Sequence, residues 1–167
     1  MTATVTLTDL NAGTRDTFVT ALGGVFEHSP WVAEGAWEHR PFASLDALHA
    51  AMVDTLMGAA KDAQLAVLRA HPDLGTRARM TEASAGEQAG AGLDRLSPAE
   101  FERLGRLNRD YRERFGFPFL FAVKGATKYD ILAALERRLT ASRDEEFSEA
   151  LRQVARIAGF RLETLLP

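Results

Sequence analysis

The strongest constraint on the fold is a run of apolar residues at helical spacing in the segment 97–116. The segment opens with Ser97-Pro98-Ala99-Glu100, which has serine at the N-cap, proline at the first helical position and glutamate three residues after the cap. Apolar side chains then recur every three or four residues along one helix face, at Phe101, Leu104, Leu107, Tyr111 and Phe115. Gly116 follows and suits the end of a helix. A helix this long with clear bounds indicates that packed helices build the core.

The rest of the chain repeats this pattern and predicts an all-α fold. We expect further helices close to residues 12–22, 31–37, 45–58, 61–70, 84–93, 129–139 and 145–166. Ser29-Pro30 and Ser44 are typical helix starts, and Gly23-Gly24 is a typical helix end. No alternation of apolar and polar residues is long enough to make a sheet. With 167 residues, of which 46% are apolar, the chain suits a single compact domain over residues 1–167, built from about eight helices.

The composition excludes several classes of function. The net charge of -3, with both signs interspersed, is unlike that of a nucleic-acid binder with a strong basic patch. The absence of cysteine excludes disulfides, thiolate zinc sites and cysteine nucleophiles. No apolar run approaches the length of a membrane span, and residues 1–13 lack the basic and apolar regions of a signal peptide. We therefore expect a cytoplasmic protein that binds neither nucleic acid nor membrane.

One of the four histidines is a candidate for acid–base chemistry. The histidines lie at positions 28, 39, 49 and 71, and none is paired at zinc-ligand spacing, so we expect no metal site. Pro72 disfavours helical conformation at His71, so the preceding helix should end near Ala70 and leave His71 at the mouth of a loop. A histidine there could act as a general acid or base. Alternatively, it could interact only with the dipole at the helix C-terminus, and the residues alone leave both interpretations open.

A second polar cluster follows at residues 84–88. Ser84-Ala85-Gly86-Glu87 fits a capping box at the start of a helix. The same hydroxyl and carboxylate, with Gln88 beside them, could instead hold a ligand rich in N–H groups, such as a ureido or hydantoin fragment, because a carboxylate offers two acceptor oxygens. Both interpretations stay open on these residues alone.

Two further features are candidates for the wall and the charge of a pocket. Residues 117–123 form the most apolar segment, and Pro118 predicts that at least its start is extended. The segment is either plain core or a pocket wall that offers backbone N–H and C=O groups. Arg161 lies beside the apolar face of the last predicted helix. A substrate carboxylate could be the anionic partner of a partly buried arginine, although a surface arginine with its stem along the helix is the common case.

Four sequence words, in this order, resemble one known family closely. They are FEHSPWVAEGAWEHRPF at 26–42, AHPDLG at 70–75, SAGEQAGAGL at 84–93 and LNRDYRERFGFPFLFAVKG at 107–125, and RLETLL at 161–166 also resembles the family's end. The family is that of 2-oxo-4-hydroxy-4-carboxy-5-ureidoimidazoline (OHCU) decarboxylases, and the resemblance covers nearly the whole chain. In one departure, many members have alanine after HPDL, where this chain has Gly75.

The resemblance implies an all-helical enzyme that needs no metal or organic cofactor and converts OHCU to (S)-allantoin and CO2 in urate degradation. The family's proton-transferring histidine falls on His71, and its carboxylate-handling arginine falls on Arg161. Its substrate-binding positions fall on Pro72, Ser84, Ala85, Gly86, Glu87, Gln88, Phe119, Leu120, Phe121, Ala122 and Val123. Because members are often homodimers, the resemblance also implies a homodimer.

Two other functions compete with this one. A helical protein-interaction module without activity would need an exposed apolar patch, and residues 117–121 are the only candidate. A lyase or hydrolase that acts on a related ureide is the second alternative. The joint presence of His71, Glu87 and Arg161 argues against the interaction module. Only substrate profiling distinguishes an enzyme for a related ureide from an OHCU decarboxylase.

Overall fold

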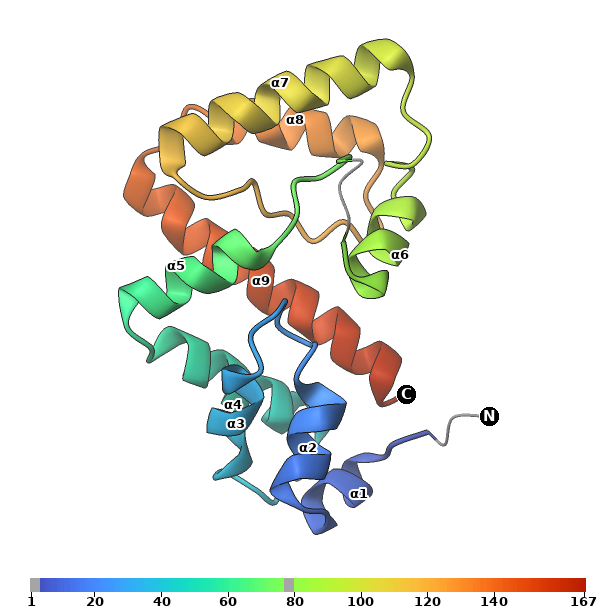
Figure 1. Cartoon of the computed structure of the whole chain (residues 1–167), viewed down its shortest axis with the longest axis vertical. Helices are drawn as coiled ribbons and strands as arrows, with labels where there is room; N and C mark the ends of the chain where they lie inside the picture. The colour runs from blue at the N-terminus through green and yellow to red at the C-terminus, as the bar shows by residue number, and fades with distance from the viewer. Residues whose placement is uncertain (1–3, 77–79) are drawn as a thin grey trace. The chain divides into compact units, whose positions relative to one another are not determined.

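The computed structural model describes residues 4–76 and 80–167, which form helices joined by loops, with no strand within those ranges (Figure 1). The all-α class predicted from the sequence is confirmed. Within the described ranges there are nine helices: α1 (Leu7–Ala12), α2 (Arg15–Leu22), α3 (Trp31–Trp37), α4 (Leu45–Met57), α5 (Lys61–Ala70), α6 (Glu82–Gly90), α7 (Pro98–Phe115), α8 (Lys128–Arg138) and α9 (Arg143–Leu165). None of these helices combines the length and the apolar character that crossing a bilayer requires.

The one helix that the sequence did not predict is α1. Its capping box joins Thr6 and Asp9, since the Thr6 hydroxyl accepts from the Asp9 amide and the Asp9 carboxylate accepts from the Thr6 amide. With six residues and only Leu10 buried, α1 is too short to show an apolar period. The neighbouring helix α2 accordingly begins at Arg15, later than the predicted 12–22.

The chain divides into two compact units, and each is described by itself. The first comprises residues 1–70 and 155–167, and the second comprises residues 71–154. Residues 143–154 of α9 therefore belong to the second unit and the rest of the helix to the first. The expectation of a single domain over residues 1–167 stays a prediction.

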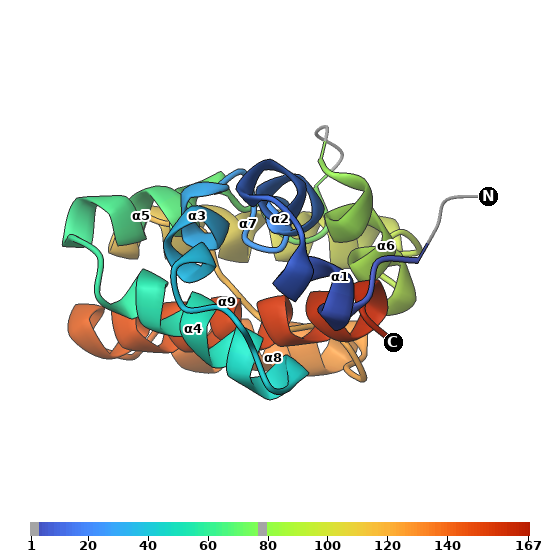
Figure 2. The same cartoon turned by 90° about the horizontal axis from the view of Figure 1, so that it is seen from below.

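In the first unit, α3 packs against both α2 and α4 (Figure 2). Phe18 is fully buried there, and its ring lies 5.5 Å from that of Trp37 and 6.2 Å from that of Phe42. The predicted serine cap of α3 is wrong. The N-cap residue is Pro30, and the Ser29 hydroxyl donates to the Glu27 carbonyl at 2.8 Å, because Ser29 closes the turn before the helix instead of capping it.

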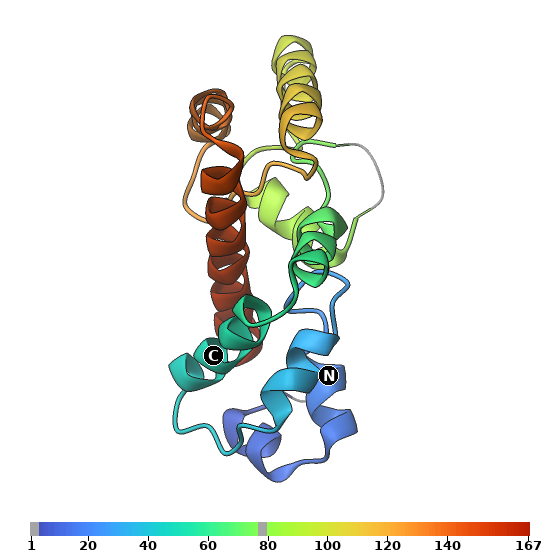
Figure 3. The same cartoon turned by 90° about the vertical axis from the view of Figure 1, so that its left-hand side faces the viewer.

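In the second unit, α7 packs against α8, as the views in Figures 1 and 3 both show. The predicted ends of α7 are confirmed: Ser97 and Glu100 form the capping box, and Gly116 follows in the left-handed conformation with φ 82°. Its apolar face is buried as predicted, with Phe101 partly exposed. The ring of Tyr111 on this face lies 4.6 Å from that of Phe115 and 5.4 Å from that of Phe119. This aromatic cluster supports the segment that follows α7.

Candidate active site

His71 lies in the loop directly after α5, which ends at Ala70 as the proline rule predicted. Its side chain is buried, with 6% of the residue exposed. Pro72 is partly exposed. A buried imidazole at the start of a loop is shielded from bulk water, which suits a group that transfers protons in a site that excludes water.

Three side chains from the second unit fix the backbone that follows His71. The Gly75 amide donates to Gln88 Oε1 at 2.8 Å, and this bond ties the loop to α6. Asn108 Nδ2 donates to the Leu74 carbonyl at 2.9 Å, and Arg112 Nη2 donates to Asp73 Oδ1 at 2.9 Å, so the loop is also tied to α7. The predicted loop continues through residues 77–79, which lie outside the described residues. These three bonds hold residues 73–75 of the loop to α6 and α7.

The backbone conformation at Gly75 explains why this chain has glycine where many family members have alanine. Its φ is +71°, a conformation that residues with a Cβ adopt at a cost. A Cβ at this position would also overlap the side chain of Leu104 and lie 3.2 Å from Leu96 Cδ1. Glycine is therefore the residue that this loop conformation requires.

The start of α6 corrects the predicted capping box. The N-cap residue is Thr81, whose hydroxyl accepts from the Ser84 amide at 3.2 Å, and the helix runs from Glu82 to Gly90 instead of over 84–93. Ser84 therefore sits inside the first turn, and Glu87 sits in the middle of the helix. Since Thr81 caps the helix, a capping role does not explain the presence of Ser84 and Glu87. This favours the interpretation that they bind a ligand.

The five predicted residues of α6 divide into two groups. Ser84 and Gln88 are buried and Glu87 is partly exposed, and their spacing of three and four residues puts them on one side of the helix. Ala85 and Gly86 are exposed on the other side. Because Gln88 Oε1 already accepts from Gly75, the amide N–H groups of Gln88 are the part of this side chain suited to a ligand.

Residues 119–123 lie in the connection between α7 and α8 and are not helical, as Pro118 predicted (Figure 1). All are buried except Phe121, which is partly exposed. Phe117, with 1% exposed, is buried as well. This burial contradicts the interaction-module alternative, which needed residues 117–121 to form an exposed patch.

A buried polar network holds this segment from behind. Arg138 Nη1 donates to the Leu120 carbonyl at 2.6 Å, and Arg138 Nε donates to Glu146 Oε1 at 2.8 Å. The Tyr111 hydroxyl donates to the same Glu146 oxygen. Burial and then the hydrogen bond to Glu146 raise the pKa of Tyr111 far above its usual value, so its proton stays in place at neutral pH. The Ala122 amide donates to Gln153 Oε1 at 2.9 Å.

Arg161, the remaining predicted site residue, belongs to the first unit. Only 7% of it is exposed, so the surface-arginine alternative is wrong. Its Nη2 donates to Glu27 Oε2 at 2.8 Å, and its Nη1 donates to the carbonyls of Gly24 and Val25 at 3.3 Å each. The anionic partner in this structure is thus Glu27, and the contact of Arg161 with a substrate carboxylate stays a prediction.

Known proteins resemble this chain over almost all of its length. Residues 11–163 match the family model described as OHCU decarboxylase. This chain belongs to the OHCU decarboxylase family. A relative from Halalkalicoccus jeotgali, named 2-oxo-4-hydroxy-4-carboxy-5-ureidoimidazoline decarboxylase, is 50% identical over 161 residues, which are 96% of this chain and 92% of the relative. A relative of the same name from Haloferax volcanii is 51% identical over 158 residues, 95% of this chain and 94% of the relative.

A solved structure agrees with this assignment. The crystal structure of an (S)-allantoin synthase superposes with a TM-score of 0.81 at 36% sequence identity. The match covers 98% of this chain and 54% of the synthase chain. As a member of the OHCU decarboxylase family, this chain therefore shares both sequence and backbone arrangement with its relatives.

The sequence analysis did not predict the Arg138–Glu146 pair, although the sequence contains a pattern that indicates it. Arg138 continues the spacing of the buried residues Ile131 and Leu135 on α8, so a charged residue occupies a core position. Glu146 likewise occupies the buried face of α9 that Ala150 continues. A charge at an apolar position indicates a buried ion pair, and Arg138 and Glu146 form one.

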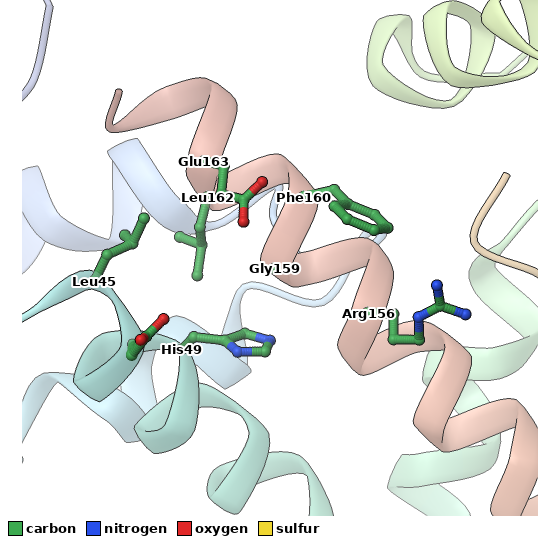
Figure 4. A pocket seen from close by; sticks show the side chains of 8 residues that line it. Leu45, His49, Arg156, Gly159, Phe160, Leu162 and Glu163 are labelled. Atoms are coloured by element: carbon green, nitrogen blue, oxygen red, sulfur yellow. The ribbon is translucent and has the colours of Figure 1, made fainter. Parts of the chain in front are cut away.

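A cavity of about 260 Å³ lies in the first unit between α4 and α9 (Figure 4), and no predicted site residue lines it. His49 points into this region toward Gly159, and its Nε2 lies 2.8 Å from the Ala155 carbonyl oxygen. His49 thus makes a partly buried contact with α9. Among the described residues, no three histidine or acidic side chains are grouped in a way that could hold a metal ion.

Proposed function

We propose that this chain is a carboxy-lyase that converts OHCU to (S)-allantoin and CO2 in urate degradation. The observation that carries the proposal is the identity of about one half with relatives named for this activity, over nearly the full length of both chains. The buried His71, in a loop whose Gly75 is bonded to Gln88 of α6, supplies the matching chemistry.

His71 has the role of proton donor in this proposal. The substrate carries a carboxylate and a hydroxyl on one ring carbon. When the bond to the carboxylate breaks, CO2 leaves and the electron pair forms a double bond to the neighbouring ring carbon, which carries the ureido group. The pair of that carbon's C=N bond moves to the ring nitrogen, which takes up the proton of the hydroxyl, and an enolate remains. The His71 imidazolium then gives its proton to the ureido-bearing carbon, the enolate oxygen becomes the ring carbonyl of allantoin, and solvent restores the proton of His71. A histidine suits this work because its charge changes near neutral pH.

The polar side of α6 orients the substrate in this proposal. The Glu87 carboxylate accepts from ring or ureido N–H groups, and Ser84 and Gln88 add further hydrogen bonds. Since a fixed orientation exposes one face of the enolate to His71, protonation there yields one enantiomer. A backbone amide of residues 119–123 stabilises the charge that develops on the carbonyl oxygen, and the rings of Phe119 and Phe121 exclude water.

The test follows the optical activity of allantoin formed from freshly generated OHCU. Wild type should form one enantiomer rapidly, whereas uncatalysed decarboxylation favours neither face and gives a racemate. His71→Asn should lower turnover by roughly 10² to 10⁴, which is the usual contribution of general acid–base catalysis. His39→Asn makes the same change at an exposed histidine and should keep wild-type turnover.

Either of two results would contradict the proposal. Racemic product at the background rate from wild type would remove the activity itself. A loss of no more than about tenfold in His71→Asn would remove the role of His71, because general acid–base catalysis is typically worth more than that. Profiling of other ureides in the same assay separates OHCU from a related substrate.

We also infer that the enzyme is a cytoplasmic homodimer, which the family resemblance supports. Sedimentation equilibrium should give twice the mass of 18.3 kDa for the chain. Fractionation of the source cells should place the activity with the cytoplasmic enzymes. A monomer at the concentration of the activity assay, or activity in another fraction, would contradict the respective inference.

A further inference from the structure

Two side chains bind the same edge of the segment 119–123. Gln153 Oε1 accepts from the Ala122 amide at 2.9 Å, and Arg138 Nη1 donates to the Leu120 carbonyl at 2.6 Å. Leu120 and Ala122 are two residues apart, and in an extended chain their backbone groups point to the same side. The rings of Phe119 and Phe121 stack with centroids 6.0 Å apart and planes within 19°, as alternate residues of an extended chain do.

The opposite edge of the segment remains available. In an extended chain this edge carries the N–H and C=O groups of Phe121 and the N–H group of Val123. Within residues 4–76 and 80–167, no hydrogen bond involves these three groups, whereas the Val123 carbonyl accepts from the Ala126 amide at 2.9 Å. Phe121 is also the one residue of the segment that is partly exposed.

The buried network fixes Arg138 in its place. Glu146, with 2% exposed, accepts both from Arg138 Nε and from the Tyr111 hydroxyl. The ring of Phe119 lies 4.5 Å from the guanidinium carbon of Arg138. Arg138 Nη2 is buried and lacks a hydrogen-bond partner among the described residues. A buried N–H without a hydrogen-bond partner destabilises the fold. The bonds of Arg138 to Glu146 and to the Leu120 carbonyl therefore outweigh the cost of leaving Nη2 unpaired.

We propose that Gln153 and Arg138 are positioning residues that turn the Leu120 carbonyl and the Ala122 amide away from the substrate and so present the Phe121 backbone pair and the Val123 amide to it. The proposal rests on the proposed function. The two free N–H groups lie about 6.6 Å apart at the rise of an extended chain, so they serve two different oxygens of the substrate. The Phe121 N–H and C=O groups form a donor and acceptor pair, which matches the adjacent C=O and N–H groups of a cyclic ureide.

The experiment compares two substitutions at Gln153 by their KM for OHCU, which does not depend on the fraction of enzyme that is folded. Gln153→Met removes the acceptor of the Ala122 amide at similar size and should raise KM by about tenfold, the effect of one typical hydrogen bond. Gln153→Glu keeps an acceptor oxygen and, when combined with Glu149→Gln so that the new carboxylate faces an amide donor, should retain the wild-type KM. Gln153 Nε2 also donates to Glu149 Oε1 at 2.7 Å, so Glu149→Ala is the matched control and should leave KM unchanged.

Amide hydrogen exchange gives a second test that needs only wild type. Addition of (S)-allantoin should slow exchange at the Phe121 and Val123 amides and leave the Ala122 amide as it was. If wild type is active and KM is unchanged in Gln153→Met, the positioning role is overturned. An equal rise in KM in Gln153→Met and in the Gln153→Glu/Glu149→Gln double variant overturns it as well. Slower exchange at Ala122 alone overturns the assignment of the free edge. A wild type without OHCU decarboxylation overturns the proposed function, and this inference with it.

Discussion

At the scale of single residues, Gly75 decides the course of the loop that carries His71. Its left-handed φ of +71° turns the chain so that its amide reaches Gln88 Oε1 at 2.8 Å. The same turn brings the backbone against the side chain of Leu104. Backbone conformation and packing therefore both require glycine.

We expect Gly75→Ala to destabilise the protein more than Gly92→Ala does. Both glycines have positive φ, at +71° and +82°, so each substitution should cost about 1–2 kcal/mol in left-handed strain. A Cβ at Gly92 meets nothing within 4 Å, whereas one at Gly75 meets Leu104, which should cost roughly 1–3 kcal/mol more. Urea unfolding of the two variants measures the difference, and equal losses of free energy would contradict the steric argument.

The sequence predicts the structural position of a residue where that position depends on neighbours in the chain. Pro72 follows His71 directly, so the end of α5 and the loop position of His71 could be predicted. The burial of Arg161 could be inferred from its neighbours on α9, but its partner Glu27 is 134 residues away in the sequence. No local rule connects two residues at such a distance. The same limit hid the bonds from Arg138 and Gln153 to residues 119–123.

At the scale of elements, α6 shows two capping signals that compete. Thr81 and Ser84 both suit an N-cap, and the glutamate three residues after Ser84 favoured the later start. The structure takes the earlier start, with Thr81 as the N-cap, so the helix begins at Glu82, and Ser84 and Gln88 are buried on one side of it. Burial of a helix face is a tertiary effect, so the capping pattern alone predicted the wrong start.

Substitutions at Thr81 and Glu87 should separate folding from substrate binding. Thr81→Ala removes the cap and should lower the free energy of unfolding by about 1 kcal/mol while KM for OHCU stays the same. Glu87→Ala should retain stability, because alanine favours a helix interior, and should raise KM. Urea unfolding and steady-state kinetics measure both quantities. A loss of stability in Glu87→Ala with unchanged KM would restore the structural interpretation of Glu87.

At the scale of the whole molecule, helical periodicity was enough to predict the fold class. Apolar spacing on segments such as α7 follows from the sequence alone, and all eight expected helices occur within the described residues. The division into two units could not be predicted, because α9 is one continuous helix whose residues belong to both. Which residues form a unit depends on contacts between distant segments, and periodicity does not contain them.

Stability should fall at alkaline pH because of Tyr111. Burial and the hydrogen bond to Glu146 raise its pKa in the folded protein above the unfolded value of about 10. The folded state therefore holds this proton more tightly, and the stabilisation is complete below pH about 10 and is lost as pH rises further. The free energy of unfolding should drop by up to about 1.4 kcal/mol for each pH unit above that value.

Tyr111→Phe should lack this alkaline loss, because it has no phenol to ionise. At neutral pH the variant should be less stable than wild type by about 1 kcal/mol, since the hydrogen bond to Glu146 is gone. Tyr129→Phe is the matched control: Tyr129 is 66% exposed, and its loss should leave the alkaline slope in place. Urea unfolding from pH about 8 to about 11 brackets the ordinary tyrosine pKa and gives all three slopes. Parallel slopes for wild type and Tyr111→Phe would mean that the Tyr111 proton does not contribute to stability, and the buried network would then depend on the Arg138–Glu146 pair alone.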